Sequence, residues 1–454
     1  MICAVCDTCV APSRSSSAKA DNGNSSASPM ISNSARTLCG AAEKFEGGIT
    51  RQIREHLKMK IIDMKVAVIG QNPVVRIITD EGIDGIGAAE APKHYLKPHI
   101  LFYKDSIMGM DPTDVERVML EIRSFAAFKP WGAAVSAIEV ALWDIAGKAV
   151  GQPIYKLLGG KIRDRVRVYN GSIAVEIDGH EPEDYAAKMR KVKALPQGFS
   201  IVKQGIAFHS NMPAEFTDYH YGDVHPNNWR RNSGKLTERG LNYTIECVQA
   251  MKEGLGDGVG LALDCGPGMT PVDTLKLAQA FEPLNLMWME DTMTGDYTPY
   301  VDPERFLQVT PYTNTPIHTG EQIYLRNNFK DLIEQHAVDV VGPDPLDVGG
   351  IAELKWVAEL ADLHGIMMAP HGVADGLIGL AALVQVSATL PENYIGFELP
   401  SGKPEWWNDI IVGLPDPIVK NGFIDVWDTP GLGIHFDVEA TRQYLRAEDA
   451  DFFD

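Results

Sequence analysis

The sequence predicts a (β/α)8-type barrel with an N-terminal α+β capping domain, and three observations point to this α/β fold class. Beyond Arg165, short apolar strands alternate with amphipathic helical segments. From Asp264 onward, the polar residues that end successive strands are separated by 26, 31, 23, 27 and 27 residues, which is the length of a βα unit. Ahead of this repeat, a strand-rich segment is followed by helical segments. Repeated βα units indicate parallel strands with right-handed crossovers, and eight strands over about 250 residues are typical of such a barrel.

The composition limits the classes of function. The chain has 454 residues, and 41 lysines and arginines stand against 61 aspartates and glutamates, which gives a net charge of −20. A charge of this sign repels phosphate backbones, so we expect no nucleic-acid partner. No segment approaches the roughly 18 consecutive apolar residues of a membrane span, and six cysteines are too few for a disulfide scaffold. We therefore expect a soluble cytoplasmic enzyme with a small-molecule substrate.

Residues 1–58 are predicted to lie outside the folded protein, as a disordered or targeting tail. They are rich in Ser, Ala, Asn and Gly and show no apolar periodicity. Four of the six cysteines lie here, namely Cys3, Cys6, Cys9 and Cys39. A C-x2-C-x2-C run with a distant fourth cysteine can ligate an iron–sulfur cluster, but the serine-rich sequence around this run cannot build a packed cage. The tail has no apolar signal-peptide core, and organellar import stays open as an alternative to a cytoplasmic location.

Residues 59–164 are predicted to form the capping domain. The β-rich runs Ile61–Ile69 and Val74–Thr79 are followed by a turn and a third short run through Ala89. Helices come next, most clearly over Ala133–Val150, where apolar residues recur at i, i+3 and i+4. A small sheet followed by helices makes an α+β domain.

Residues 165–424 are predicted to form the barrel. Its strands are expected to end near Val168, Lys203, Asp264, Glu290, His318, Gly342, Ala369 and Phe397. One interval breaks the rhythm, because 61 residues separate Lys203 from Asp264. Residues 207–235 fill it with a polar, aromatic insert, and so long an insert above a barrel strand is usually a lid or a specificity loop. The closing segment, residues 425–454, is expected to return to the capping domain.

Three carboxylates are predicted to form a metal site. Asp264, Glu290 and Glu321 stand at the predicted carboxyl ends of consecutive strands, and the active site of a barrel lies at that end. Any one of them alone would more often be a salt-bridged barrel residue. Three converging carboxylates repel one another unless a cation lies between them, and ligation by oxygen alone is the preference of Mg²⁺.

The strands that follow end in Asp344, His371 and Glu398. Neighbouring strand ends can bring Asp344 within hydrogen-bonding distance of His371. A carboxylate on one ring nitrogen fixes the tautomer and raises the basicity of the imidazole, so the other nitrogen is left to take a proton. Lys203 ends an earlier strand on the other side of the barrel mouth, and its ammonium group is expected to be directed at the metal centre.

In these residues and spacings the chain resembles the mandelate racemase-type branch of the enolase superfamily. Four further motifs carry the resemblance, which spans residues 60–437: TDEGIDGIG (79–87), SAIEVALWDIAGKAVGQPIYKLLGG (136–160), PDPLDVGGI (343–351) and DTPGLGIHFD (428–437). The resemblance implies a capping domain over a modified barrel, one Mg²⁺, a homo-oligomer and abstraction of the proton on the carbon α to a carboxylate. The metal and the groups around it would stabilise the resulting enediolate, and enzymes of this superfamily use a Lys or His base.

Two departures from this branch bear on the reaction. The branch often has Lys-x-Lys on the second strand, with the second lysine as a base, whereas this chain reads Lys203-Gln204-Gly205. Some acid-sugar dehydratases of the branch have a histidine two residues after the first metal ligand, where this chain has Gly266. A 1,1-proton transfer needs a base on each face, so racemisation is disfavoured, whereas a β-elimination can run with His371 alone.

A loop residue is expected to pair with Lys203. The related mannonate dehydratases have an arginine at the position of Lys203, paired with a tyrosine from the following loop. Tyr219 and Tyr221 are the candidates for that tyrosine, and His209 and His220 are alternatives.

The predicted activity is therefore that of an Mg²⁺-dependent hydro-lyase acting on a sugar acid, an aldonate or a similar polyhydroxy monocarboxylate. His371, tuned by Asp344, would remove the C2 proton, and loss of the 3-hydroxyl would give an enol that tautomerises to a 2-keto-3-deoxy acid. Glu398 would hydrogen-bond the substrate carboxylate, while Lys203 would offset its charge or donate a proton. Three loops would select the sugar, at residues 93–95, 125–131 and 207–235.

Other functions explain less of the sequence, although a cycloisomerase or epimerase on the same scaffold stays open and would exchange the α proton without losing water. A nucleotide-dependent oxidoreductase is disfavoured, because Gly85-x-Gly87 lacks the third glycine and the helix of a dinucleotide fingerprint, and the glycines at 254–260 precede a strand. A metal-dependent aldolase or sugar isomerase would explain the carboxylates but not the spacing of Asp344 and His371. A non-catalytic regulator would have no reason to keep mutually repelling acids.

Overall fold

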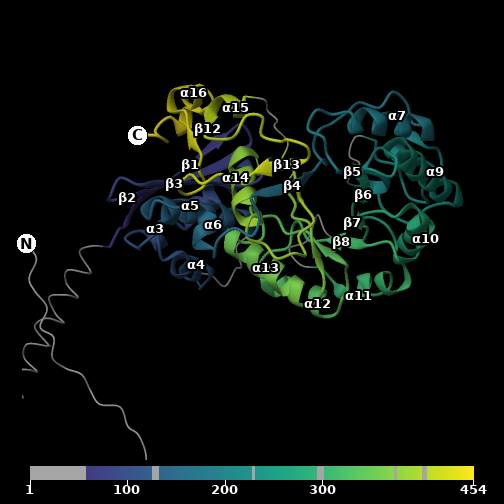
Figure 1. Ribbon diagram of the computed structural model, residues 1–454, viewed down its shortest axis with the longest axis horizontal. Coiled ribbons are helices and arrows are strands. Elements are labelled where there is room, and N and C mark those ends of the chain that lie inside the picture. Colours follow the sequence, from purple (N-terminus) through teal and green to yellow (C-terminus); the bar gives the residue numbers. More distant parts are fainter. Residues whose placement is uncertain (1–57, 125–131, 227–230, 294–300, 373–375, 401–405) are drawn as a thin grey trace, which may run out of the picture. The chain divides into compact units, whose positions relative to one another are not determined.

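The computed structural model describes residues 58–124, 132–226, 231–293, 301–372, 376–400 and 406–454 (Figure 1). Residues Met59–Asp454 form one unit. The tail cysteines and the loop at 125–131 lie outside the described residues, so what the sequence suggests for them stays a prediction. Among the described helices, none combines the length and the apolar character needed to cross a membrane.

The N-terminal sheet matches the prediction from sequence. Three antiparallel strands, paired in chain order, make it up: β1 (Ile61–Ile69), β2 (Asn72–Thr79) and β3 (Asp84–Ala88). Helix α5 (Gly132–Ala149) packs on β2 and β3 and is buried along most of its length. A Cβ at Gly87 would lie 2.0 Å from the backbone oxygen of Ala137 in α5. The glycines of β3 thus allow close packing of strand on helix, which explains the Gly85-x-Gly87 pattern without any nucleotide.

Short helices complete this N-terminal region. They are η1 (His94–Leu96), α2 (Lys97–Phe102), α3 (Lys104–Ile107), α4 (Val115–Ser124) and α6 (Ile154–Leu157). The predicted helix at Ala133–Val150 is confirmed as α5. Apart from α6, whose buried residues join the core of the barrel, the sheet and these helices share a hydrophobic core that includes Met64, Val75, Ile100, Val118 and Ile138.

The barrel is confirmed, with eight parallel strands. They are β4 (Arg165–Tyr169), β5 (Ile201–Gly205), β6 (Gly260–Asp264), β7 (Trp288–Glu290), β8 (Ile317–Thr319), β9 (Val340–Val341), β10 (Met367–Met368) and β11 (Phe397–Glu398). Six of them pair in the order β10-β9-β8-β7-β6-β5, and β11 pairs in parallel with β4. Parallel bridges from Asn170 to Val202 and from Met368 to Tyr394 join the two sets. The strands therefore close on themselves, and every strand ends within two residues of the predicted position.

Helices and short 3-10 turns connect the strands of the barrel. They are α7 (Pro182–Lys193), η2 (Ala207–His209), α8 (Met212–Glu215), α9 (Glu238–Leu255), α10 (Pro271–Phe281), η4 (Glu282–Leu284), α11 (Pro303–Phe306), η5 (Thr310–Tyr312), α12 (Arg326–Glu334), α13 (Ile351–Leu363) and α14 (Gly376–Ser387). Figure 1 shows α7, α9 and α10 beside strands β5 to β7. The insert at 207–235 contributes η2 and α8 before α9 begins.

The C-terminal segment contacts the N-terminal sheet. Its elements are α15 (Trp407–Ile410), β12 (Ile411–Val412), β13 (Phe423–Asp425), β14 (His435–Phe436), α16 (Val438–Arg442) and η6 (Ala447–Asp449). The Asp449 carboxylate accepts a hydrogen bond of 2.9 Å from the backbone N–H of Val68 in β1, and the guanidinium of Arg76 donates one of 3.0 Å to the carbonyl of Phe452. The exact boundaries of the predicted domains stay predictions.

Two polar contacts, one buried and one partly buried, tie the N-terminal region to the barrel. Glu139 in α5 accepts hydrogen bonds of 2.8 and 2.9 Å from the backbone N–H groups of Ile351 and Ala352, the first residues of α13. These donors have no partner within a helix, so Glu139 caps α13 from another element. Lys93 lies 2.8 Å from Asp347, three residues after Asp344. The loop at 93–95 is thereby fixed next to the carboxyl end of β9.

Candidate active site

Predicted site residues from strands around the whole barrel meet at the carboxyl ends of those strands. Six of them are buried there: Lys203, Asp264, Glu290, Asp344, His371 and Glu398. Glu321 is partly buried beside them. The sequence pattern therefore located the cluster, although its roles stay predictions.

The ammonium group of Lys203 lies among three carboxylates. Its Nζ is 2.8 Å from Oε1 of Glu290, 3.0 Å from Oε2 of Glu398 and 3.6 Å from Oδ2 of Asp264. Burial alone would lower the pKa of Lys203, but Glu290 and Glu398 outweigh it and hold that pKa well above its usual value. Lys203 is thus a fixed positive charge at the centre of the acids.

His371 is held between carboxylates on both ring nitrogens. Its Nδ1 is 2.7 Å from Oδ2 of Asp344, and its Nε2 is 3.2 Å from Oε2 of Glu321 and 3.6 Å from Oε2 of Glu398. Burial would lower the pKa of His371, but Glu321 and the hydrogen bond to Asp344 raise that pKa well above its usual value. The other oxygen of Asp344 accepts a hydrogen bond of 2.6 Å from the backbone of Leu346. Asp344 is therefore fixed, and the ring directs Nε2 toward the acids.

A glycine makes room for this arrangement. Gly171 follows β4, and a Cβ at this position would lie 1.8 Å from Oε1 of Glu398 and 3.1 Å from Cε of Lys203. The carboxylate of Glu398 could not keep its place beside a larger residue, and the Lys203 side chain would have to shift slightly. The sequence pattern did not single out Gly171, because a glycine after a strand has no distinguishing feature.

The acids could hold a metal ion. Carboxylate oxygens of Glu290, Asp291 and Glu321 lie within 4.8 Å of one another. Glu290 and Asp291 are each 1% exposed, and buried like charges at this distance favour a bound cation. A donor set made of oxygens alone fits a hard divalent cation such as Mg²⁺.

Asp291 was not predicted as a member of this set. Side chains alternate along a strand, so a residue that directly follows Glu290 is expected to point away from it. Asp291 instead has a φ of +49°, which breaks the alternation at the end of β7. The predicted ligand Asp264 contacts Lys203 and His209 in this structure. Burial would raise the pKa of Asp264, but His209 and Lys203 hold that pKa well below its usual value.

His209 is a member of the site that the sequence suggested only as an alternative. Its Nδ1 lies 3.0 Å from Oδ1 of Asp264. The residue ends η2, and its backbone N–H donates a hydrogen bond of 3.0 Å to the carbonyl of Cys265. A Cβ on Gly266 would lie 3.0 Å from the Cβ of His209. His209 thus occupies the space beside Gly266 from a different segment of the chain.

The structure does not bring the two predicted tyrosines to Lys203. Tyr219 is fully buried, and its hydroxyl shares a hydrogen bond of 2.8 Å with that of Thr244 in α9. Tyr221 is 74% exposed. The ring of His220 packs edge-on against Phe208, with 5.4 Å between the ring centroids. In the described part of the insert, the aromatic residues therefore pack a local core or face solvent, and His209 is the side chain that reaches the acids.

Comparison with known proteins is consistent with this geometry. Residues 47–159 match the family model of the mandelate racemase/muconate lactonizing enzyme N-terminal domain, and residues 186–441 match that of the enolase C-terminal domain-like family. Similar curated proteins include a D-xylonate dehydratase from Haloferax volcanii, 30% identical over 85% of this chain and 89% of that protein. A D-mannonate dehydratase from Sphingomonas sp. (strain SKA58) is 30% identical over 86% of this chain and 96% of that protein.

A solved structure shares the fold. The mandelate racemase/muconate lactonizing enzyme-like protein from Rubrobacter xylanophilus aligns with a TM-score of 0.73 and 29% identity, over 86% of this chain and 98% of that chain. The two family models together cover both the N-terminal sheet with its helices and the barrel.

Proposed function

The chain belongs to the mandelate racemase/muconate lactonizing enzyme family of the enolase superfamily, and from this premise we propose that it is an Mg²⁺-dependent dehydratase that converts an aldonate into a 2-keto-3-deoxy acid. Its named relatives are dehydratases of sugar acids, which makes the chain a hydro-lyase of this superfamily. The observation that carries the proposal is the buried pair of Asp344 and His371, in which Asp344 holds Nδ1 and Nε2 is directed at the acid cluster, 3.2 Å from Glu321.

His371 is the proposed base. Nε2 takes the proton from the substrate carbon α to the carboxylate, while Asp344 holds Nδ1 and stabilises the imidazolium that forms. The bond between C3 and its hydroxyl oxygen then breaks, and the proton on His371 completes the departing water. The enol that remains tautomerises to the 2-keto acid. One base is sufficient, because the proton that is removed is also the one returned.

Lys203 and Glu398 are proposed to bind the substrate carboxylate. Lys203 supplies a permanent positive charge that favours the carboxylate and the negative charge that develops when the α proton leaves. Glu398 lies 3.0 Å from Lys203 and 3.6 Å from His371, and burial raises the pKa of Glu398. A proton shared between Glu398 and the substrate carboxylate would let the two groups form a hydrogen bond.

The acid cluster is proposed to hold the metal through Asp264, Glu290 and Glu321. Asp291 is the competing ligand, because its oxygens lie within the same group. A divalent cation bound here would supply positive charge against the substrate carboxylate. Lys203 and His371 partly neutralise the same acids in this structure.

His209 is proposed to contact the hydroxyl groups of the sugar acid. The third and seventh strands of an eight-stranded barrel lie opposite each other, and these are β6, which carries Asp264, and β10, which precedes His371. His209 packs against Asp264 with 29% of its side chain exposed. We therefore expect His209 to contact the face of the substrate opposite to the one that His371 approaches.

This placement favours one second candidate, an epimerase or cycloisomerase of a sugar acid. A 1,1-proton transfer needs an acid–base group on each face of the carbon acid. The absence of a second lysine after Gln204 disfavours such a transfer. His209 restores a polar group on that side. Dehydration remains the first choice because the named relatives above are dehydratases.

A substrate screen tests the proposal. The full chain is incubated with Mg²⁺ in D2O and a library of aldonic and aldaric acids, and 2-keto-3-deoxy product and α-deuterium are scored separately. Product from one or a few aldonates is expected, and His371→Asn is the matched control that should give none. Deuterium uptake without product would replace the dehydratase with an epimerase. Absence of both, with protein that binds Mg²⁺ and is folded, would refute the proposed chemistry.

A further inference from the structure

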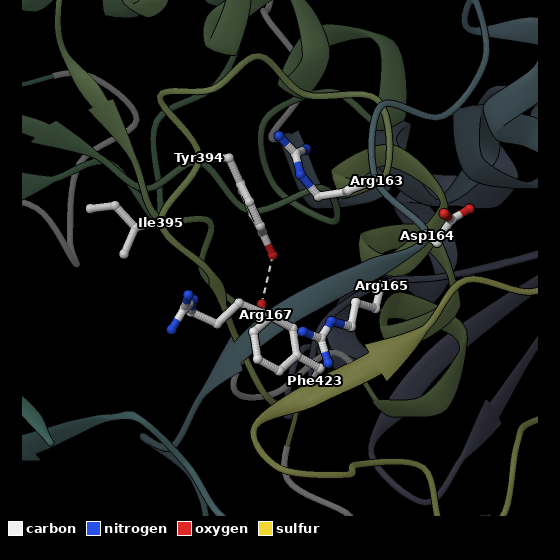
Figure 2. Close-up of a pocket in the computed structure, with 7 residues that line it drawn as sticks. All are labelled: Arg163, Asp164, Arg165, Arg167, Tyr394, Ile395 and Phe423. Carbon is white, nitrogen blue, oxygen red and sulfur yellow. Dashed lines mark hydrogen bonds between the residues drawn. The ribbon is translucent and has the colours of Figure 1, made fainter. Parts of the chain in front are cut away.

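A pocket at the start of strand β4 is lined by three arginines that the proposed reaction does not use (Figure 2). Its volume is about 430 Å³, within the roughly 300–1,000 Å³ of small-molecule sites. The lining consists of Arg163, Asp164, Arg165, Arg167, Tyr394, Ile395 and Phe423. Figure 2 shows Phe423, from β13, beside the arginines of β4, with the Tyr394 hydroxyl directed at the backbone of Arg167.

The pocket lies at the end of the barrel opposite the acid cluster. Arg165, Arg167 and Tyr169 alternate along β4, so their side chains share one face of the strand. The ring of Tyr169 is inside the barrel, 5.3 Å from the ring of Trp288 between centroids. The ammonium of Lys203 is 6.0 Å from the centroid of the same Tyr169 ring. Tyr169 therefore separates the arginines, at the amino-terminal mouth, from the site at the carboxyl-terminal mouth.

The three arginines differ in how many hydrogen bonds their guanidinium groups donate to the rest of the protein. Arg163 donates hydrogen bonds to the carbonyls of Ser387, Leu390 and Pro391, at 2.6, 2.8 and 3.0 Å, and so closes the end of α14. Arg167 uses one nitrogen for a hydrogen bond of 2.8 Å to the hydroxyl of Ser200. The guanidinium of Arg165 stacks 4.3 Å above the ring of Phe423.

Within the described part of the chain, neither Arg165 nor Arg167 forms an ion pair with a carboxylate. Asp164, the acid that lines the pocket, is 91% exposed and lies 3.2 Å from Lys161. Arg163 lies 4.0 Å from the exposed carboxylate of Glu392, so Arg165 and Arg167 are the arginines of the pocket that carry its positive charge, in a protein of net charge −20. A basic pocket on an acidic protein favours an anionic ligand, because the positive potential is local to the pocket.

We propose that this pocket binds a small phosphate monoester that carries a ring, such as a nucleoside monophosphate. The guanidinium of Arg165 makes no hydrogen bond within the described residues and that of Arg167 makes one, to Ser200, so each keeps N–H groups that can donate to the oxygens of a phosphate. Tyr394, Ile395 and Phe423 also line the pocket and provide apolar and aromatic surface for the ring. The site is separate from the catalytic cluster, so the ligand is distinct from the sugar-acid substrate.

Titration calorimetry on the full chain tests this site. The probes are AMP, adenosine and inorganic phosphate, and the proteins are the unchanged chain, the double variant Arg165→Gln/Arg167→Gln and the control Arg117→Gln. Arg117 is an exposed arginine of α4 whose partner is Asp114 at 3.6 Å, so its loss removes the same kind of charge elsewhere. We expect AMP to bind the unchanged chain and the control equally and the double variant at least tenfold more weakly. Added salt should weaken the binding of AMP to the unchanged chain.

Three outcomes would overturn the proposal. Equal AMP affinity in the double variant and the control would place the ligand elsewhere. If inorganic phosphate binds as tightly as AMP, the ring does not contribute to binding and the proposed ligand class is wrong. If AMP does not bind at millimolar concentration, the pocket is not a binding site for such a ligand. If the double variant fails to fold, Arg165→Gln alone keeps the test, because the guanidinium of Arg165 makes no hydrogen bond within the described residues. Turnover of the sugar acid should be unchanged in Arg165→Gln, so failure here is distinguishable from failure of the proposed enzyme activity.

Discussion

Oδ2 of Asp344 lies 2.7 Å from Nδ1 of His371, although 27 residues separate the two in the chain. Asp344 is fully buried and His371 is 3% exposed. A buried carboxylate bound to Nδ1 leaves Nε2 as the nitrogen that can exchange a proton with substrate. The two side chains meet because each follows a strand of the barrel, and adjacent parallel strands of a barrel end side by side.

His371→Asn is expected to abolish both dehydration and α-deuterium exchange, while Mg²⁺ affinity stays the same. Asp344→Asn is the companion variant, and it should lower kcat by about 10²- to 10⁴-fold, because Asn stabilises the imidazolium less well. Turnover and deuterium exchange are measured by NMR, and Mg²⁺ binding by calorimetry. Exchange that survives in His371→Asn would assign the base to another group.

The metal ligands can be identified by separate substitutions. We expect Asp264→Asn, Glu290→Gln and Glu321→Gln each to weaken the binding of Mn²⁺, followed by EPR as a substitute for Mg²⁺, by at least tenfold. Asp291→Asn is the discriminating variant, because Asp291 already accepts a hydrogen bond from the hydroxyl of Thr319. We expect its effect on Mn²⁺ affinity to be smaller than that of Asp264→Asn. The reverse order would make Asp291 the ligand and Asp264 a partner of Lys203 and His209.

The sequence predicted the positions that depend on the repeat of the barrel. Strand ends recur at the length of a βα unit, so the spacing alone assigned residues such as Glu290, Asp344 and His371 to one mouth of the barrel. The β-rich composition of 61–69 and 74–79 likewise identified β1 and β2. These features depend on periodicity and local composition, which short-range sequence patterns carry directly.

The sequence could not predict the positions that depend on irregular backbone. His209 ends η2, whose first residue, Ala207, has a φ of +47°, and Asp291 has a φ of +49°. Residues other than glycine rarely adopt this conformation, so no sequence pattern predicts it. Tyr219 was expected at the site because the resemblance to mannonate dehydratases implies a loop tyrosine beside Lys203, but its ring packs with those of Phe208 and Tyr243. Tertiary packing thus places the ring of Tyr219 in a local core and not at the site.

His209→Ala is expected to raise the KM for the sugar acid by about tenfold, as the loss of one hydrogen bond of about 1.4 kcal/mol predicts. Exchange of the α proton should continue, because His371 is unchanged. His209→Asn keeps a hydrogen-bonding group beside Asp264 and should recover part of the affinity. A KM unchanged in both variants, with normal turnover, would show that His209 does not contact the substrate.

Gly171→Ala is expected to lower kcat strongly without unfolding the protein. The added methyl carbon would lie 1.8 Å from Oε1 of Glu398, so the carboxylate must move away from Lys203 and His371. Gly258→Ala is the matched control, because a Cβ there would meet nothing within 4 Å. Steady-state kinetics and thermal melting are measured on both. Full activity in Gly171→Ala would show that the position of Glu398 is not required.

Glu139→Gln tests the contact between α5 and α13 through its pH dependence. Burial raises the pKa of Glu139 to about 8, even though the backbone N–H groups of Ile351 and Ala352 and the indole of Trp143 hydrogen-bond its carboxylate. In the unfolded chain the pKa is near the ordinary glutamate value of about 4.3. The folded state therefore binds the proton more tightly, and Glu139 reduces the free energy of unfolding as pH rises from about 4.3 to about 8. The slope from one proton is at most about 1.4 kcal/mol per pH unit.

Gln does not titrate, so the stability of Glu139→Gln relative to the unchanged chain should rise over this range and level off above it. Urea unfolding at several pH values measures the difference, with Glu253→Gln on the exposed face of α9 as the control. A difference independent of pH would show that Glu139 is ionised throughout and that the helix terminus of α13 compensates for its burial.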